Sequence, residues 1–586
     1  MPVSRNVLRR VFESESSISA EQCPKTLAYR NSGAGPEPTF VFPDRNRTVV
    51  FDPLFVGAVS TPTRSAFRTD YCSGPSISAH SMRIRVDWRS SCSLSGTVLK
   101  WIAVPLAVPL LLAVVDGDDV LPFAAAVVVT VVLGAALELL SDDRELGQRE
   151  GFLMVAFTWL SVGLVGAIPF YLAGLAAGPD SAFYSLVNAA FESMSGLTTT
   201  GATIMNGWDF ANQSRAILLW RQILQWLGGL GILIVAIGLL SNLMVGGAQL
   251  METETQTKNV TKLTPQIEST ARLIWGLYVG LTVLAAATFY ALQLLGLAEN
   301  MHLFNAVAHA LTSVSTAGFS PEAESIAAFE PIVQWAITPF MLLGATNFVL
   351  LYYVVQGDFE RPLESEELRF YLGLVVGISA IVAFIIGIDP EMDFGLEATI
   401  RHGVFNVVSM VTTTGYASAN FDLWTAGAKH VLFLCMFLGG MAGSTTCSIK
   451  TLRWLVIVKG LYRNFFTSIH PEAVRPVRLG DGVVDEETIT DIFAYVMLAI
   501  VIFFLLTVLI VVDAARSGTT VTEFEALGAA ASIFLNIGPA FGMAGPMDNY
   551  AGFPATTRAV MVIMMWIGRI EIIPVLVLLL PAYWQS

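Results

Sequence analysis

Residues 191–203 read FESMSGLTTTGAT, an apolar stretch that runs into a turn of Thr and Gly. Three later segments have the same form, and they contain FNAVAHALTSVSTAGFS, FNVVSMVTTTGYAS and ASIFLNIGPAFGMAG. With their flanks, the four segments cover residues 183–203, 304–320, 399–418 and 523–545. Each apolar part is too short to cross a bilayer, because a transmembrane helix needs about 20 residues. We therefore interpret each segment as a half-helix followed by a re-entrant loop.

Longer apolar segments flank every half-helix, and two more precede the first. They are 98–116, 120–140, 151–176, 215–240, 271–297, 331–356, 370–388, 428–461, 491–513 and 555–583. The order span, loop, span recurs four times, aligned on Gly201, Gly318, Gly415 and Gly538, and forms an internal repeat. We predict an all-α polytopic membrane protein of ten transmembrane helices, two N-terminal and eight in four span–pore-loop–span repeats around a central pore. The predicted units are accessory helices at 98–140 and pore repeats at 151–240, 271–356, 370–461 and 491–583.

The composition excludes most soluble classes of protein. Hydrophobic residues make up 54% of the chain and charged residues only 14%, against about a quarter in soluble domains. The net charge of −14 argues against a nucleic-acid partner. The chain has no phosphate-binding GxxxxGK[ST], no HExxH and no nucleophile elbow, so we do not expect an enzyme. His309 and His402 have no further ligands nearby, and we expect no tightly bound cofactor.

Residues 1–81 differ from the rest, being polar and without an apolar run or a signal-peptide pattern. They are either a disordered extension or translated upstream DNA with the true start at Met82, which we favour. Basic residues gather in alternate loops, namely Lys258, Lys262, Arg361, Arg369, Lys450, Arg453, Lys459, Arg463, Arg475 and Arg478. The positive-inside rule therefore places both termini in the cytoplasm of a cell-membrane protein.

The four loops have the composition that a cation pathway needs. Non-helical backbone at membrane depth must be buried in protein or line a watery cavity. Four such loops on one axis would form a ring of carbonyls that replaces the hydration shell of a monovalent cation. Glycine lets successive carbonyls turn inward, and the C-terminal ends of the half-helices favour a cation. The alternative is a set of amphipathic extracellular helices with Gly/Thr turns.

Two further features suit a gated pore. Residues 428–461 would be about 50 Å long as one helix, too long for a single crossing, and their middle is rich in small residues. We interpret this stretch as a broken helix in the cavity, although a helix-packing face is also compatible with it. Arg569 and Glu571 interrupt the last span, where a charge faces a cavity or a partner, or reaches an interface. Arg221 is expected to be structural, and Cys447 to be a small buried hydrophobic side chain.

Several motifs together resemble those of one family. They are FESMSGLTTTGAT (191–203), LLWRQILQWLGGLGI (218–232), TPQIESTARLIWGLYVGLTVL (264–284), STAGFS (315–320), TTTGYAS (412–418), FLGGMAGSTTCSIK (437–450) and NIGPAFG (536–542). The chain resembles the Trk/Ktr/HKT superfamily of potassium transporters, and within it the TrkH branch, over roughly residues 90–583. The resemblance implies a K⁺ filter formed by Thr199, Thr200, Gly201, Thr316, Ala317, Gly318, Thr413, Thr414, Gly415, Asn536, Ile537 and Gly538. Each loop offers one matching glycine, which implies looser K⁺ selectivity than the longer signature of tetrameric channels.

The same resemblance implies a gate and partners. The gate would be an intramembrane loop with Gly439, Gly440, Gly443, Ser444 and Thr445, together with Arg569 as an electrostatic barrier below the filter. The protein would be a homodimer in the lipid bilayer. A TrkA-like, nucleotide-binding cytoplasmic subunit would dock on the loops at 241–270, 357–369 and 459–490.

Three functions compete at this point. The leading hypothesis is K⁺ uptake through the four-repeat pore. The second is a K⁺ symporter coupled to Na⁺ or H⁺, against which the scarcity of intramembrane carboxylates argues, since Glu192 and Glu571 are the candidates. The third is a membrane-embedded enzyme, for which the sequence shows no nucleophile or metal cluster.

Overall fold

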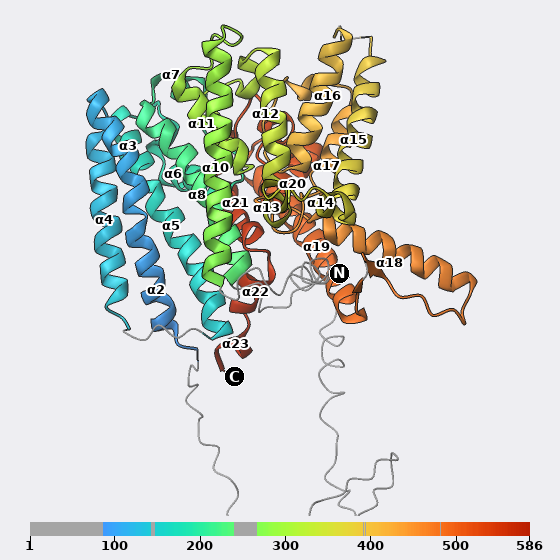
Figure 1. The fold of residues 1–586 in the computed structure, drawn as a ribbon. Coiled ribbons are helices and arrows are strands. Elements are labelled where there is room, and N and C mark those ends of the chain that lie inside the picture. The colour runs from blue at the N-terminus through green and yellow to red at the C-terminus, as the bar shows by residue number, and fades with distance from the viewer. Residues whose placement is uncertain are drawn as a thin grey trace, which may run out of the picture. The chain divides into compact units, whose positions relative to one another are not determined.

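The computed structural model describes residues 86–141, 147–238, 267–390, 392, 394–480 and 482–585. In these ranges the chain is mostly helical, and Figure 1 shows the long helices running side by side. The predictions made for residues 1–81 and for most of the loop at 241–270 lie outside the described residues.

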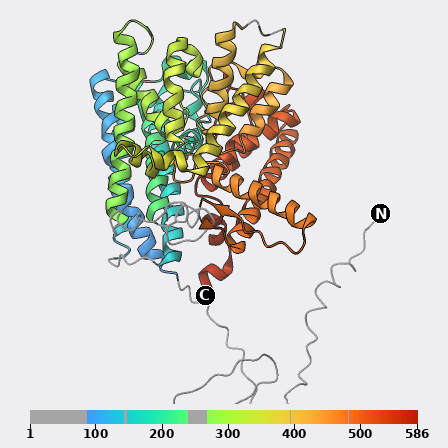
Figure 2. The same cartoon turned by 45° about the vertical axis from the view of Figure 1, so that its right-hand side comes forward.

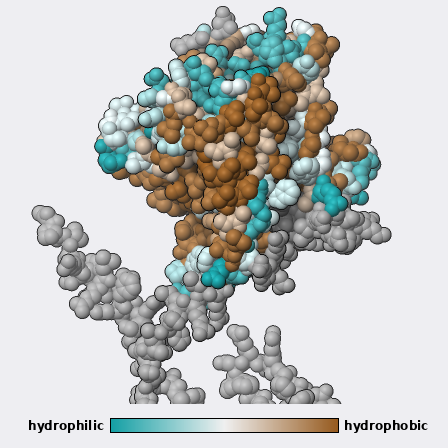
Figure 3. Space-filling view, turned by 90° about the vertical axis from the view of Figure 1, so that its left-hand side faces the viewer, coloured by the Kyte–Doolittle hydropathy of each residue, from teal (hydrophilic) through white to brown (hydrophobic). Residues whose placement is uncertain are grey.

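Within the described ranges, seven helical stretches are long and apolar enough to cross a membrane. They are Trp88–Asp116, Val120–Glu138, Arg149–Ala177, Arg215–Leu233, Ala271–Leu294, Glu366–Gly387 and Glu486–Ser517. The helix pair Pro331–Gly344 and Phe348–Val355 is an eighth candidate. Apolar side chains cover the middle of the face in Figure 3. The predicted all-α membrane fold is thereby confirmed, whereas the count of ten spans stays a prediction.

The N-terminal helices pack against the first repeat. They are α2 (Trp88–Trp101), α3 (Ala103–Asp116) and α4 (Val120–Glu138), beside α5 (Gln148–Ala177). The first helix begins well before the predicted start at residue 98. The reason is that its serines find hydrogen-bond acceptors in α5 and in the residues after α4: Ser91 Oγ donates to the Glu150 carbonyl at 3.0 Å, and Ser93 Oγ donates to the Ser141 carbonyl at 2.8 Å. Hydrogen-bonded hydroxyl groups allow a polar turn to be buried.

Four half-helices pack between the spans of their own repeats. They are α6 (Leu186–Leu197), α11 (Leu303–Val314), α16 (Leu396–Val411) and α20 (Glu523–Leu535). In the first repeat, α6 lies between α5 and α8 (Arg215–Gly238), and in the second, α11 lies between α10 (Ile267–Leu294) and α12 (Pro331–Gly344). In the third repeat, α16 lies between α15 (Glu366–Gly387) and α17 (Ala426–Cys435), and in the fourth, α20 lies between α19 (Glu486–Ser517) and α21 (Ala555–Arg569). Between repeats, α6 packs on α21, α11 on α8 and α16 on α12. The half-helices therefore follow one another around a common centre.

Two spans that the sequence predicts as continuous are interrupted. At 331–356, α12 and α13 (Phe348–Val355) meet at 108°. The carbonyls that end α12 are occupied by another segment, because Thr445 N–H donates to Gly344 at 3.2 Å and Met441 N–H donates to Ala345 at 2.9 Å. At 555–583, α21 ends at Arg569 and is followed by α22 (Ile573–Leu578) and α23 (Pro581–Gln585).

The third repeat contains a long non-helical segment. Its α17 ends at Cys435, and residues 436–450 lead to α18 (Thr451–Ile469), which projects from the lower end of the bundle (Figures 1 and 2). A short antiparallel pair, β1 (Arg478–Leu479) and β2 (Gly482–Val483), follows it. The remaining elements are α7 (Gly207–Asn212), α14 (Glu360–Glu364) and the 3₁₀ turns Ala182–Tyr184, Ser325–Ala328, Phe421–Leu423, Gly542–Ala544 and Tyr550–Gly552.

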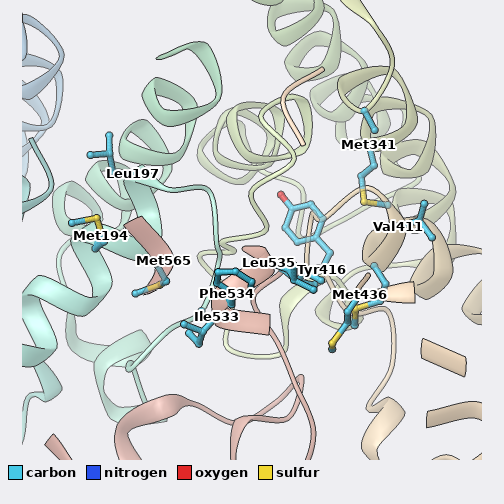
Figure 4. Packing of buried hydrophobic residues seen from close by; sticks show 14 of the residues in the cluster. Met194, Leu197, Met341, Val411, Tyr416, Met436, Ile533, Phe534, Leu535 and Met565 are labelled. Carbon is cyan, nitrogen blue, oxygen red and sulfur yellow. The ribbon is translucent and has the colours of Figure 1, made fainter. Parts of the chain in front are cut away.

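Apolar side chains surround the loops that follow the half-helices. Figure 4 shows Phe534, Leu535 and Tyr416 near the middle of this packing. The methionines around them come from three different helices and one loop, and they are Met194, Met341, Met436 and Met565. Apolar side chains thus pack around the loops on the side of the protein interior, where unpaired backbone groups are costly.

Candidate functional site

All four half-helices end in the same turn. The first loop residue has a left-handed backbone, uncommon outside glycine, with φ of 53° at Thr199, 50° at Thr316, 51° at Thr413 and 56° at Asn536. Two residues later comes a left-handed glycine, with φ of 77° at Gly201, 82° at Gly318, 81° at Gly415 and 112° at Gly538. The residue between donates its N–H back to the half-helix at 2.9 Å, in the pairs Thr200–Ser195, Ala317–Thr312, Thr414–Ser409 and Ile537–Ser532. Three different triplets, Thr-Thr-Gly in two loops, Thr-Ala-Gly and Asn-Ile-Gly, therefore adopt the same turn.

The four loops meet in a closed ring. A Cβ atom built on each glycine would collide with a carbonyl oxygen of the next loop. The distances are 2.4 Å from Gly201 to Ala317 O, 1.8 Å from Gly318 to Thr414 O, 2.0 Å from Gly415 to Ile537 O and 2.8 Å from Gly538 to Thr200 O. The contacts run from the first loop to the second, third and fourth and back to the first. Glycine is required at each place both by the close approach and by the positive φ.

Short hydroxyl side chains brace the loops from behind. Ser195 Oγ donates to the Ala202 carbonyl at 2.5 Å, and Ser409 Oγ donates to the Tyr416 carbonyl at 2.6 Å. In the fourth loop, Ser532 Oγ donates to Gly538 at 2.6 Å. These three serines occupy the same position in their half-helices, so the support repeats with the fold.

A fully buried ion pair lies behind the first two loops. Arg221 Nε donates to Glu192 Oε1 at 2.7 Å, and the side chains are 1% and 0% exposed. Arg221 also donates to the Ser320 carbonyl at 3.1 Å and lies 4.1 Å from the centroid of the Phe319 ring. Glu192 accepts the Ile204 N–H at 2.9 Å. The pair ties the half-helix and loop of repeat one to the loop of repeat two, which matches the structural role expected for Arg221.

A cavity opens on one side of the ring. Its empty volume is about 660 Å³, and all four ring glycines line it. Glu322 and Asp548 add carboxylates to its wall. Burial and the neighbouring carboxylate of Asp422 raise the pKa of Asp548 above its ordinary value. Oxygen-rich, partly acidic walls suit a cation that approaches the ring.

On the other side of the ring, residues 436–450 contact the first residue of three loops. Thr445 Oγ1 lies 2.9 Å from Thr316 Oγ1, and Cys447 N–H donates to Thr413 Oγ1 at 3.1 Å. Cys447 Sγ lies 4.0 Å from Thr199 Oγ1. These three threonines are buried, so the segment covers the inner end of the ring.

The small residues of this segment permit its tight packing. A Cβ at Gly439 would lie 2.5 Å from the Cys447 carbonyl, and one at Gly440 would lie 2.7 Å from the Ala345 carbonyl. Gly443 has φ of 75°, and its carbonyl accepts the Phe348 N–H at 3.2 Å. Ser444 Oγ donates to the Met441 carbonyl at 2.6 Å, which closes a local turn.

Arg569 joins the last span to this segment. Its Nη1 donates to the Thr445 carbonyl at 3.0 Å and to Cys447 Sγ at 2.7 Å, and its Nη2 donates to the Gly228 carbonyl at 2.9 Å. The side chain is 1% exposed, and among the described residues no carboxylate pairs with it. A buried positive charge is therefore held next to the inner end of the ring, and the nearby Glu571 carboxylate interacts with it electrostatically without forming an ion pair.

The break that follows Arg569 is strained. Ile572 has φ of 56° and ψ of −62°, and Ile573 N–H donates to the Glu571 carbonyl at 2.5 Å. This is the γ-turn with positive φ, which is rare and strained, above all for a β-branched residue. Glu571 Oε2 accepts from Arg453 Nη2 at 2.6 Å, so α18 holds the turn from outside.

Three residues have contacts at the site that the sequence does not predict. The sequence predicts only a small buried hydrophobic side chain at Cys447, yet it accepts a hydrogen bond from Arg569. Arg453 belongs to the basic loop residues in the sequence, and in the structure it donates to Glu571. Gln225 donates to the Ala317 carbonyl, and its spacing of one helical turn from Arg221 on the same helix face is the sequence signal for it. Among the described residues, no group of His, Cys, Asp and Glu could hold a metal ion.

Comparisons with known proteins agree with this architecture. The model of the TrkH family, described as cation transport protein, matches residues 121–379 and 393–586. The Trk system potassium uptake protein TrkH of Halomonas elongata is 34% identical over 500 residues, which are 84% of this chain and 98% of the relative. TrkH of Escherichia coli K12 is 31% identical over 448 residues, 76% of this chain and 88% of the relative.

A solved structure extends the comparison to three dimensions. The crystal structure of the potassium transporter TrkH from Vibrio parahaemolyticus matches with a TM-score of 0.75 at 26% sequence identity. The match covers 85% of this chain and 100% of the other. The similarity therefore includes the whole of that transporter chain.

Proposed function

The chain belongs to the TrkH family of cation transport proteins, and on that premise we propose that it takes up K⁺ across the cell membrane through the ring of four loops. The family consists of transporters and not of enzymes. The relatives from Halomonas elongata and Escherichia coli are named potassium uptake proteins, which is the ground for choosing K⁺ as the transported ion.

The observation that carries the proposal is the closed circuit of glycine-to-carbonyl contacts between successive loops. A ring of backbone carbonyls can replace the hydration shell of K⁺. The half-helices run toward the ring, so their C-terminal ends add negative potential there. In this proposal the ring is the selectivity filter, made of Thr199, Thr200, Gly201, Thr316, Ala317, Gly318, Thr413, Thr414, Gly415, Asn536, Ile537 and Gly538.

Residues 436–450 are the gate in this proposal. Their contacts with Thr316 and Thr413 cover the inner end of the filter, so the conformation described here is closed. Arg569 secures that conformation through Thr445 and opposes a cation electrostatically. Opening requires the segment to leave these partners.

In this proposal, one side of the protein faces the cytoplasm and binds a partner protein there. Both termini lie in the cytoplasm in this scheme, because the basic residues at the end of α18 and after it, such as Arg463, Arg475 and Arg478, follow the positive-inside rule. The resemblance to the Trk/Ktr/HKT superfamily supports a homodimer and a TrkA-like, nucleotide-binding subunit. This subunit would dock on the loops at 241–270, 357–369 and 459–490.

Coupled symport is the weaker candidate, because the intramembrane carboxylates are occupied. Glu192 is paired with the buried Arg221, and Glu571 is paired with Arg453. A carboxylate that relays protons must exchange its partner during transport, and both of these hold structural positions. We therefore propose passive flow along the electrochemical gradient.

Flux in proteoliposomes tests this function. The full chain is reconstituted, and uptake of K⁺, Rb⁺ and Na⁺ is measured with no imposed Na⁺ or proton gradient. We expect K⁺ and Rb⁺ to enter along their own electrochemical gradients. Flux that appears only when a Na⁺ or proton gradient is imposed would favour the symporter. Absence of K⁺ flux under both conditions, with the regulatory subunit added, would reject the proposal.

A further inference from the structure

Gln225 on α8 holds the second loop with both ends of its side-chain amide. Its Nε2 donates to the Ala317 carbonyl at 2.5 Å, and its Oε1 accepts the Phe319 N–H at 2.9 Å. The two hydrogen bonds bracket Gly318, one of the ring glycines. The side chain is 0% exposed, so water does not compete for either bond.

The Ala317 carbonyl belongs to the ring. It faces Gly201, as the carbonyls of Thr414, Ile537 and Thr200 face the glycines of the other loops. Among these four carbonyls in the described part of the chain, only that of Ala317 accepts a side-chain hydrogen bond. A carbonyl oxygen has two lone pairs, so this bond leaves one for an ion.

The second loop needs this external brace because it lacks an internal one. In the first loop the hydroxyls of Thr198 and Thr200 lie 2.7 Å apart, and in the third loop those of Thr412 and Thr414 do the same. Ala317 occupies the position of Thr200 and Thr414 and has no hydroxyl group. The amide from α8 therefore replaces a hydrogen bond that the loop cannot make itself.

The fourth loop also lacks the Thr–Thr contact, and a different side chain from outside the loop stabilises it. It has Ile537 at the corresponding position, again without a hydroxyl group. Here Tyr550 donates its hydroxyl to the Gly538 carbonyl at 2.9 Å. The two loops without the Thr–Thr contact are thus the two in which a carbonyl at or next to the ring glycine accepts a hydrogen bond from a long side chain outside the loop.

We propose that Gln225 is a positioning residue for cation selectivity, which fixes the Ala317 carbonyl in the ring. The inference rests on the proposed function, because it takes the four carbonyls as ligands of the ion. Without the amide, no side chain holds the Ala317 carbonyl, and the peptide between Ala317 and Gly318 can change its orientation more easily, since glycine populates both signs of φ. Discrimination between K⁺ and Na⁺ depends on the number and field strength of the carbonyl ligands, so a mobile carbonyl weakens it.

The test replaces the amide by an apolar side chain of similar length. Gln225→Met is compared with Gln222→Met, which changes another fully buried glutamine three residues earlier on the same helix. The amide of Gln222 makes no hydrogen bond to any described residue. Both variants are made in the full chain, checked by size-exclusion chromatography and reconstituted, and the ratio of K⁺ to Na⁺ flux is measured.

We expect Gln225→Met to lower this ratio by up to about tenfold, the effect of one well-formed hydrogen bond. Gln222→Met should keep the wild-type ratio, since only packing changes there. An unchanged ratio in Gln225→Met, or an equal fall in both variants, would overturn the inference. If Gln225→Met does not fold, Gln225→Asn serves instead, because its amide is one carbon too short to span both bonds. An unchanged ratio of K⁺ to Na⁺ flux in Gln225→Asn would also overturn the inference.

Failure of the proposed function is distinguishable from failure of this inference. A wild-type protein that passes K⁺ and Na⁺ equally well contradicts the filter itself, and this is seen before any variant is made. If the wild type is selective and Gln225→Met has the same ratio of K⁺ to Na⁺ flux, only the role of Gln225 is contradicted.

Discussion

Arg569 donates a hydrogen bond of 3.0 Å from Nη1 to the carbonyl of Thr445, across a sequence separation of 124 residues. Thr445 in turn contacts Thr316, the first residue of the second loop, at 2.9 Å. Thr445 therefore links the last span to the ring, through its backbone carbonyl on one side and its hydroxyl group on the other. In the proposed mechanism, movement of the last span reaches the ring by this route.

Removal of the Arg569 guanidinium should raise K⁺ flux. Arg569→Met deletes the charge and three hydrogen bonds to Thr445, Cys447 and Gly228, and we expect flux to rise by about tenfold or more. Arg569→Lys keeps the charge but not the forked geometry and should give an intermediate flux. The measurement is Rb⁺ uptake in proteoliposomes. Wild-type flux in Arg569→Met would remove this residue from the gate.

A side chain on a ring glycine should reduce selectivity. Gly415 has φ of 81°, and its Cβ would lie 2.0 Å from the Ile537 carbonyl. Gly415→Ser must displace that carbonyl, so we expect the ratio of K⁺ to Na⁺ flux to fall. Gly373→Ser is the control, because nothing lies within 4 Å of its Cβ position. Equal ratios in the two variants would show that the third loop does not select the ion.

The buried ion pair should matter more to stability than an exposed one. Glu192→Gln leaves the buried Arg221 guanidinium charged and without its carboxylate, which should destabilise the protein by about 3–5 kcal/mol. Asp116→Asn removes the partner of Arg215, whose side chain is 58% exposed, and should cost at most about 1 kcal/mol. Thermal unfolding in detergent compares the two. A similar shift for both variants would contradict the structural role of the buried pair.

In the strained turn after Arg569, a glycine variant should be more stable than an alanine variant, which is the reverse of the usual order. At position 572, where φ is 56°, Gly should be more stable than Ala by about 1 kcal/mol, because Ala retains the Cβ clash. At position 570, where φ is −89°, Ala should be the more stable residue. Ile570 and Ile572 are both buried, so each pair of variants loses a comparable side chain. Melting temperatures of the four variants decide the point. A higher melting temperature for Ile572→Ala than for Ile572→Gly would mean that this turn stores no strain.

The sequence predicts the elements of this fold better than the contacts between them. Short apolar segments between longer ones show where the chain turns back, and Gly201 or Gly415 marks a turn because glycine tolerates positive φ. The partner of each glycine is a carbonyl about a hundred or more residues away, or more than three hundred for Gly538, and no local pattern indicates it. The all-α membrane fold could thus be predicted, whereas the ring geometry required the structure.

The interrupted helices also depend on contacts that local sequence patterns do not reveal. Residues 331–356 are mostly apolar and contain no charged residue, and hydropathy alone predicts a single continuous span. The bend arises because Thr445 and Met441 take the carbonyls at the end of α12, which is a tertiary effect. The role of Gln225 is hidden from the sequence for a similar reason: a polar amide in an apolar helix suggests a partner, but that partner, the Ala317 carbonyl, lies in another repeat.

The most direct test of the central claim is the position of the ion itself. Crystals of the full chain grown in Rb⁺ would be measured at the rubidium absorption edge, and the anomalous map inspected at the ring. The account predicts a peak enclosed by the carbonyls of Thr200, Ala317, Thr414 and Ile537. Rubidium peaks elsewhere in the molecule with none at the ring would contradict the claim that the four loops form the filter.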